Sequence, residues 1–193
     1  MKKDSIALFG TSANPPTYGH QAILESLLPL FPKVVTWASD NPFKAHGIPL
    51  NKRCQLLKLL VNEINNPKIQ IVQELSSPWA ISTIKKANQI WPSHSFTFVI
   101  GSDLTEQISS WLNANEVLTQ VRIAIAPREN WPINSEQIKK LERLGGKIDI
   151  LPISIPNTSS SKIRDEKEFL QVPNIIRNIV IEQNLYGSSR NIT

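Results

Sequence analysis

The stretch that decides the fold is residues 5–20, which read SIALFGTSANPPTYGH. Residues 5–9 form a short apolar run that ends at Gly10, which is the pattern of a buried β-strand. The residues that follow include two prolines and several small hydroxyl side chains, which are typical of a tight loop. A helix is expected to begin near Gly19. This order predicts a strand–loop–helix unit whose loop offers backbone N–H groups to a ligand.

The same alternation of strand and helix continues to the end of the chain. We expect strands at residues 5–9, 34–37, 69–72, 96–100, 121–126 and 148–151. We expect helices at 19–30, 52–64, 80–90, 134–144 and from 173 to about 187. This alternation predicts an α/β fold, a Rossmann-like doubly wound parallel sheet in a single domain over 1–187, with 188–193 as a disordered tail. In such sheets ligands bind at the carboxyl ends of the strands, so the residues after strands are the candidates for function.

Length and composition fit one globular domain. The chain has 193 residues, of which 40% are hydrophobic and 19% charged, and one core can hold such a chain without cross-links. Cys54 is the single cysteine, which excludes an internal disulfide and a cysteine cage for a metal. The first residues are too poor in apolar side chains for a secretory signal, and no stretch approaches a membrane span. We therefore expect a cytoplasmic protein with no membrane partner.

The net charge of +5 comes from scattered lysines. We interpret these mainly as solvated helix faces, with an electropositive bowl that gathers phosphorylated substrates as the alternative. There is no arginine-rich run and no interleaved aromatic stripe, so we expect no nucleic-acid partner.

The first loop has the features of a phosphate site. The start of its helix offers unpaired N–H groups and a partial positive charge. Gly19 has no side chain, so an adenine ring or a phosphate can approach the backbone closely. His20 can donate a hydrogen bond to a phosphate oxygen from its ring, and Thr17 can add a hydroxyl donor. The alternative is a loop histidine that only caps its helix.

A second candidate site lies near the end of the chain, where residues 158–164 read TSSSKIR. Successive hydroxyls and backbone N–H groups can form a phosphate nest, and Arg164 adds a planar fork of donors. The alternative is a serine-rich helix cap with solvated basic residues.

Together the two motifs resemble the (H/T)xGH and ISSTxIR signatures of the nucleotidyltransferase superfamily. Within it the chain is similar to the nicotinate-nucleotide adenylyltransferases, from residue 6 to residue 187. The resemblance implies transfer of AMP from ATP to nicotinate mononucleotide, giving deamido-NAD and pyrophosphate in NAD biosynthesis. It implies ATP and a pyridine mononucleotide as partners, Mg²⁺ bound through ATP, and no protein metal site. It is also compatible with a homo-oligomer.

The resemblance also implies site residues. The implied catalytic set is Thr17, His20, Lys44, Ser160 and Arg164. The implied ATP-binding set is Gly10, Thr11, Ser12, Gly19, His20, Gly101, Asp103, Ser159, Ser161, Ile163 and Arg164. The implied acceptor-binding set is Lys44, Arg53, Trp79, Thr83, Trp111 and Arg128. Asp103 would bind the ribose of adenosine, and Trp111 would stack on the pyridine ring.

The chain departs from the family pattern at several positions. Thr11 stands where the family has a second glycine, and Asn14 where it has an aspartate. Trp79 and Ala80 replace a tyrosine and a threonine near the expected acceptor. These changes leave open a sister adenylyltransferase that acts on nicotinamide mononucleotide or phosphopantetheine, and a regulator that binds nucleotide without turnover.

Overall fold

The computed structural model describes residues 5–41, 46–153, 155 and 160–188. The strands are β1 (Ser5–Thr11), β2 (Lys33–Ala38), β3 (Ile69–Ile71), β4 (Ser95–Gly101), β5 (Arg122–Ala126) and β6 (Lys147–Ile150). The α-helices are α1 (Tyr18–Leu27), α2 (Leu50–Ile64), α3 (Ala80–Ile90), α4 (Ala114–Gln120), α5 (Ser135–Arg143), α6 (Ser160–Glu166) and α7 (Asn174–Glu182). Short 3₁₀ segments are η1 (Gln73–Leu75), η2 (Ser102–Ser110), η3 (Phe169–Gln171) and η4 (Leu185–Gly187).

Within the described residues the strands form one parallel sheet in the order β3-β2-β1-β4-β5-β6. The order reverses direction between β1 and β4, so the loops that follow these two strands diverge and leave a crevice at their carboxyl ends. This confirms the expected doubly wound Rossmann-like fold in a single domain. It places the loop after β1, with its Thr-x-Gly-His motif, at the centre of the sheet edge where ligands bind.

Successive side chains of β1 point to opposite faces of the sheet and join two separate hydrophobic layers, as the pleat of a strand requires. Ala7 and Phe9 pack with the apolar faces of α1, α2 and α7 on one side of the sheet. Ile6 and Leu8 pack with η2, α3 and α4 on the other side. The sheet is therefore covered on both faces, and its central strand β1 is buried except at Gly10, which is partly exposed.

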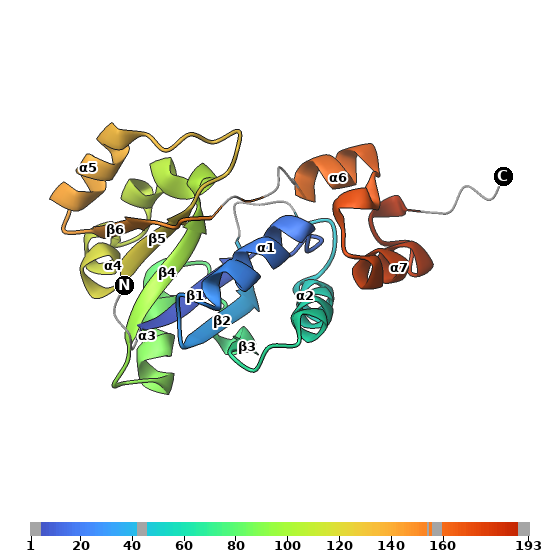
Figure 1. Cartoon of the computed structure of the whole chain (residues 1–193), viewed down its shortest axis with the longest axis horizontal. Helices are drawn as coiled ribbons and strands as arrows, with labels where there is room; N and C mark the ends of the chain where they lie inside the picture. The colour runs from blue at the N-terminus through green and yellow to red at the C-terminus, as the bar shows by residue number, and fades with distance from the viewer. Residues whose placement is uncertain (1–4, 42–45, 154, 156–159, 189–193) are drawn as a thin grey trace.

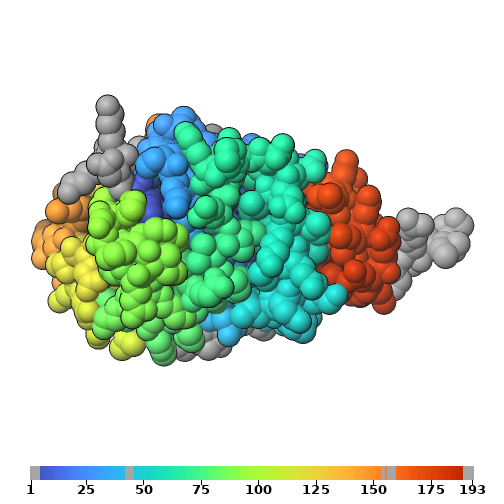
Figure 2. All heavy atoms as spheres, turned by 90° about the horizontal axis from the view of Figure 1, so that it is seen from below, coloured from blue at the N-terminus to red at the C-terminus, as the bar shows by residue number. Residues whose placement is uncertain are grey.

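The C-terminal helices α6 and α7 lie together beside α2, at the end of the molecule away from α4 and α5 (Figure 1). Seen from below, they form a distinct lobe next to α2 (Figure 2). Ile163 of α6 and Ile176 and Val180 of α7 join the same buried cluster as α1 and α2. This packing carries the second motif to the loop that precedes α1. None of the helices in the described part of the chain is long and apolar enough to cross a membrane.

The end of the chain differs from its expected form. The last helix ends at Glu182 instead of near Gly187, and η4 follows it. Ser188, the first residue of the expected tail, donates its hydroxyl to Val180 O, and the rest of that tail lies outside the described residues. The domain boundary therefore stays a prediction.

Two further details depart from the sequence pattern. Asn134 and Gln137 have the spacing of a capping box at the start of the expected 134–144 helix. Asn134 does cap α5 by accepting from Glu136 N, but the Gln137 side chain donates to Thr105 O. The segment η2 and the helix α4 were not anticipated, because short helical pieces carry little apolar periodicity.

Gly10 lies against the indole ring of Trp37 in the neighbouring strand β2. It pairs in register with Trp37, and a Cβ at Gly10 would lie 2.6 Å from Trp37 Cζ2. We predict that Gly10→Ala lowers the free energy of unfolding by about 1–3 kcal/mol through overpacking, measured by urea denaturation. In a Trp37→Phe background the same change should cost less, since the second ring is gone. An equal cost in both backgrounds would show that the contact with Trp37 is not the cause.

Candidate functional site

The N-terminus of α1 is built by a reciprocal cap between Thr17 and His20. Thr17 N donates to His20 Nδ1 at 3.0 Å, and Thr17 Oγ1 lies 2.8 Å from the same nitrogen. A backbone N–H can only donate, so Nδ1 is the acceptor and the proton of the neutral ring lies on Nε2. The motif thus orients His20 as a hydrogen-bond donor at the positive end of a helix, where an anion is favoured.

The second motif closes onto the loop that precedes α1. Ser160 Oγ donates to Pro15 O at 2.9 Å, across 145 residues of sequence. Arg164 Nη1 donates to Asn14 O at 2.6 Å, and its Nη2 lies 3.3 Å from Ser161 Oγ. A guanidinium has five N–H donors, so these contacts anchor Arg164 without using all of them. The second motif is therefore anchored on the loop that leads into the first.

Arg53 holds two loops together beneath the site. The residue is 1% exposed, and its Nη1 donates to Ser12 O at 2.8 Å and to Ser39 O at 2.7 Å. Its Nη2 lies 3.8 Å from a carboxylate oxygen of Asp40. Burial lowers the pKa of Arg53, while Asp40 and Tyr186 oppose this shift. The buried guanidinium of Arg53 therefore joins the loop after β1 to the loop after β2 and supports both loops from inside the protein.

On the other side of β1, the end of β4 is joined to the segment after β5. Asp103 Oδ2 forms an ion pair with Arg128 Nη1 at 3.1 Å. A Cβ at Gly101 would lie 2.3 Å from Asp103 Oδ1, so a side chain there would displace the Asp103 carboxylate from its present position. Ser102 Oγ accepts from Arg128 N at 3.0 Å and donates to Trp131 O at 2.7 Å.

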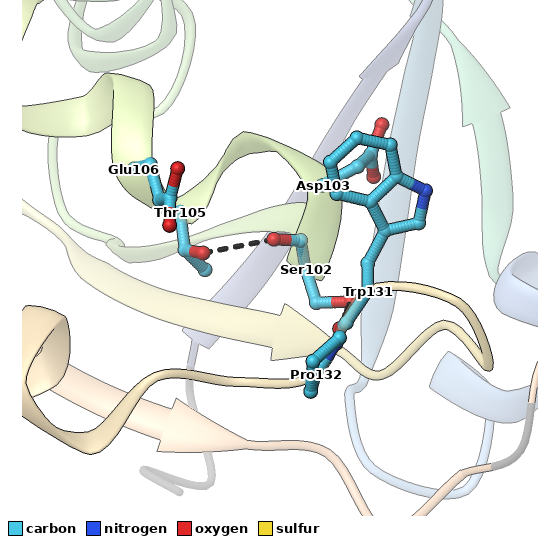
Figure 3. A pocket seen from close by; sticks show the side chains of 6 residues that line it. All are labelled: Ser102, Asp103, Thr105, Glu106, Trp131 and Pro132. Carbon is cyan, nitrogen blue, oxygen red and sulfur yellow. Dashed lines mark hydrogen bonds between the residues drawn. The ribbon is translucent and has the colours of Figure 1, made fainter.

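These contacts border a hollow of about 140 Å³ beside Asp103 (Figure 3). It is lined by Ser102, Asp103, Thr105, Glu106, Trp131 and Pro132. Figure 3 shows the indole of Trp131 standing next to the Asp103 carboxylate. Trp131 is 54% exposed, which is unusual for so large an aromatic side chain.

The expected acceptor side carries tryptophans with different surroundings. Trp111 packs edge-on against Phe98, with ring centroids 6.0 Å apart, and is half-buried. Trp79 precedes α3 and is 39% exposed. Thr83 is buried, and its hydroxyl donates to Leu75 O. The two tryptophans thus present partly open aromatic surface, whereas Thr83 is engaged inside the protein.

The remaining expected residues fall into three groups. Lys44 and Ser159 lie outside the described residues. Ile163 is buried in the core and Thr11 Oγ1 accepts from Ala13 N, so contacts of these two with ATP would come from the backbone. Gly19 is buried within the first turn of α1. In the part of the chain that the structure describes, no three His, Cys, Asp or Glu side chains gather to hold a metal ion.

Sequence reasoning missed three residues that organise this region: Ser102, Trp131 and Tyr186. Tyr186 donates its hydroxyl to Asn14 Oδ1 at 2.8 Å. No sequence pattern marked these residues, because each contacts a segment that is distant along the chain.

The hydrogen bonds of Arg53 to Ser12 O and Ser39 O, which we call the Arg53 clamp, lead to a stability prediction. Arg53→Ala leaves the carbonyls of Ser12 and Ser39 without this donor, so we expect the free energy of unfolding to fall by about 1–3 kcal/mol. Lys58→Ala, an exposed cation on the same helix, should stay within about 0.5 kcal/mol of the parent protein in the same urea titration. Equal effects of the two changes would mean that the clamp does not stabilise the loops.

Comparisons with known proteins agree with this architecture. The cytidylyltransferase-like family pattern matches residues 8–166. A Synechocystis sp. protein named "Probable nicotinate-nucleotide adenylyltransferase" is 35% identical, over 94% of this chain and 98% of its own length. A Leptospira interrogans protein of the same name is 29% identical, over 91% of each chain. The Plasmodium falciparum nicotinic acid mononucleotide adenylyltransferase complexed with NaAD superposes with a TM-score of 0.79 at 22% identity, covering 96% of this chain and 98% of that chain. The chain belongs to the cytidylyltransferase-like family and, within it, to the nicotinate-nucleotide adenylyltransferases.

Proposed function

We propose that this protein transfers AMP from ATP to the 5′-phosphate of nicotinate mononucleotide, giving deamido-NAD and pyrophosphate. The observation that carries the proposal is the contact of Ser160 and Arg164, from the second motif, with Pro15 O and Asn14 O in the loop that leads to Thr17 and His20. This contact gathers donors at the switch point of the sheet, where nucleotides bind in such folds.

The chemistry requires little beyond positioning. An oxygen of the acceptor phosphate attacks the α-phosphorus of ATP in line, a new P–O bond forms, and the bond to the pyrophosphate oxygen breaks. A phosphate dianion is already a nucleophile, so no side chain has to remove a proton. Catalysis then comes from holding the two phosphates in line and from donors aimed at the developing charge.

In this scheme His20 and Arg164 act as the main donors. The Nε2–H of His20 and the N–H groups that open α1 face the α- and β-phosphates, and Arg164 neutralises charge on the leaving pyrophosphate. Lys44 and Ser159 would add further donors, with Thr17 and Ser160 holding the geometry. Charge-assisted hydrogen bonds of this kind are about twice as strong as neutral ones.

Mg²⁺ enters as part of the substrate, Mg-ATP. The described residues contain no acidic cluster for a protein-held ion, and Mg²⁺ commonly binds through nucleotide phosphates while keeping several waters. Bound in this way, it supplies charge neutralisation on the phosphate oxygens.

The two sides of the site are assigned to the two substrates. We assign Asp103, which forms an ion pair with Arg128, the role of accepting from the ribose hydroxyls of adenosine. Trp111 and Trp79 offer aromatic surface for a pyridine ring, and Arg53 supports the acceptor loops from below.

Incubation of the purified protein with Mg-ATP and one acceptor at a time tests the proposal. The acceptors are nicotinate mononucleotide, nicotinamide mononucleotide and phosphopantetheine, and the readout is pyrophosphate together with the adenylylated product. We expect deamido-NAD from the nicotinate acceptor. Turnover only with another acceptor would replace the substrate assignment, and ATP binding without turnover would favour a regulator.

His20→Ala should lower kcat about a hundred- to a thousandfold, equivalent to about 2.7–4 kcal/mol of barrier, because a donor to the transition state is lost. The matched control is His94→Ala, an exposed histidine after α3, which should leave kcat unchanged. A loss of less than fivefold in a folded His20 variant would remove this residue from the catalytic set.

Trp111→Ala should raise the KM for the mononucleotide acceptor more than the KM for ATP, because stacking worth about 0.5–1.5 kcal/mol is lost. Trp91→Ala is the control, since Trp91 is also half-buried and packs on Phe96, another phenylalanine of β4. If both variants are less stable than the parent protein but keep its KM for the acceptor, Trp111 is a packing residue.

A further inference from the structure

Tyr186 lies after α7, in a backbone conformation that demands support. Its φ of 61° and ψ of 20° are in the left-handed region, which a bulky residue rarely adopts. Residues held in such conformations persist when the surrounding contacts fix them. The contacts of Tyr186 are made with Asn14, in the loop that precedes α1 (residues 12–17, the signature loop), and with Gly47, which precedes α2.

The side chain of Tyr186 is inserted between two loops of the candidate site. Its hydroxyl donates to Asn14 Oδ1 at 2.8 Å, although 172 residues separate the two. A Cβ at Gly47 would lie 3.2 Å from Tyr186 Cδ1, so the ring lies directly on that glycine. Burial raises the pKa of the phenol, outweighing the opposing effect of Arg164 and Arg53. The hydroxyl therefore remains protonated and able to donate at neutral pH.

Asn14 is held at two points by the C-terminal part of the chain. Its backbone oxygen accepts from Arg164 and its side-chain oxygen accepts from Tyr186. Asn14 is only 2% exposed and lies shortly before Thr17 and His20. Fixing the peptide and the side chain of one residue sets both the position and the rotation of the loop. The place of the His20 donor therefore depends on Tyr186.

We propose that Tyr186 is a positioning residue for adenylyl transfer, which through Asn14 and Gly47 holds the signature loop in its reactive geometry. This inference rests on the proposed function. Tyr186 does not have to touch either substrate, and it acts by keeping His20 and Arg164 in line with the reacting phosphates. Displacements of about 1 Å at a reacting centre can cost about a hundredfold in rate.

Tyr186→Phe tests this role because it removes the hydroxyl and keeps the ring on Gly47. We expect kcat to fall about ten- to a hundredfold, with the KM for nicotinate mononucleotide within about twofold. Ser188→Ala is the matched control. Ser188 also donates a buried hydroxyl, but to Val180 O inside the C-terminal lobe, so kcat should not change. Unchanged kcat in Tyr186→Phe, or equal losses in both variants, would overturn the proposal.

Hydrogen–deuterium exchange gives a readout that does not need turnover. In Tyr186→Phe, amides in residues 17–21 should exchange about tenfold faster than in the parent protein, while the amides of α5 exchange at the parent rate. In Ser188→Ala, the amides in residues 17–21 should also exchange at the parent rate. Unaltered exchange at 17–21 would refute the positioning role even if no acceptor were turned over. Silence of the parent protein with every acceptor would instead refute the proposed function.

A double variant shows whether the hydrogen bond itself carries the effect. Asn14→Ala and Tyr186→Phe remove the two partners, so the combined variant should be no slower than the slower single variant. Losses in kcat that multiply would show that the two residues act separately, which contradicts the inference.

Discussion

The candidate site depends on carbonyl groups of the loop between β1 and α1 that accept hydrogen bonds from side chains distant along the chain. A tight loop at the end of a buried strand leaves carbonyls that need donors from elsewhere. Here Ser12, Asn14 and Pro15 accept from Arg53, Arg164 and Ser160. Each donor comes from a helix that packs on the same face of the sheet as α1. Packing of these helices and formation of the site are therefore one event.

Such an arrangement suits a reaction that needs positioned donors more than reactive side chains. The loop is held by the buried guanidinium of Arg53, by Ser160 and Arg164 of α6, and at Asn14 by Tyr186 of the C-terminal segment. What remains exposed to a substrate is the start of α1, with the His20 ring oriented by Thr17. Donors that are already oriented cost no reorganisation when charge develops on a phosphate, which is the main source of catalysis in such sites. The proposed acceptor side carries Trp79, which is exposed, and Trp111, which is half-buried against Phe98.

Much of this could be predicted from the sequence, for clear physical reasons. Short apolar runs such as residues 5–9 and helical periodicity such as that of α2 reflect burial directly, so the elements and the parallel sheet were expected. The resemblance put residues of both motifs in one implied catalytic set, and the second motif lies on the loop that leads into the first. Local patterns carry no information on partners that are distant along the chain. For this reason the hydrogen bonds of Arg53 to Ser12 O and Ser39 O were not anticipated, and Tyr186 was not singled out at all. The short segment η2 and the early end of α7 were missed because tertiary contacts, not periodicity, determine them.

The central claim is direct transfer of the adenylyl group between two phosphates held in line, with no covalent intermediate on the protein. The stereochemistry at the α-phosphorus tests this most directly. A single diastereomer of ATP with sulfur on the α-phosphorus would be converted, with nicotinate mononucleotide as acceptor, and the configuration of the product determined by ³¹P NMR. One in-line displacement predicts inversion. Retention would indicate two displacements through an adenylylated side chain, and would contradict the account.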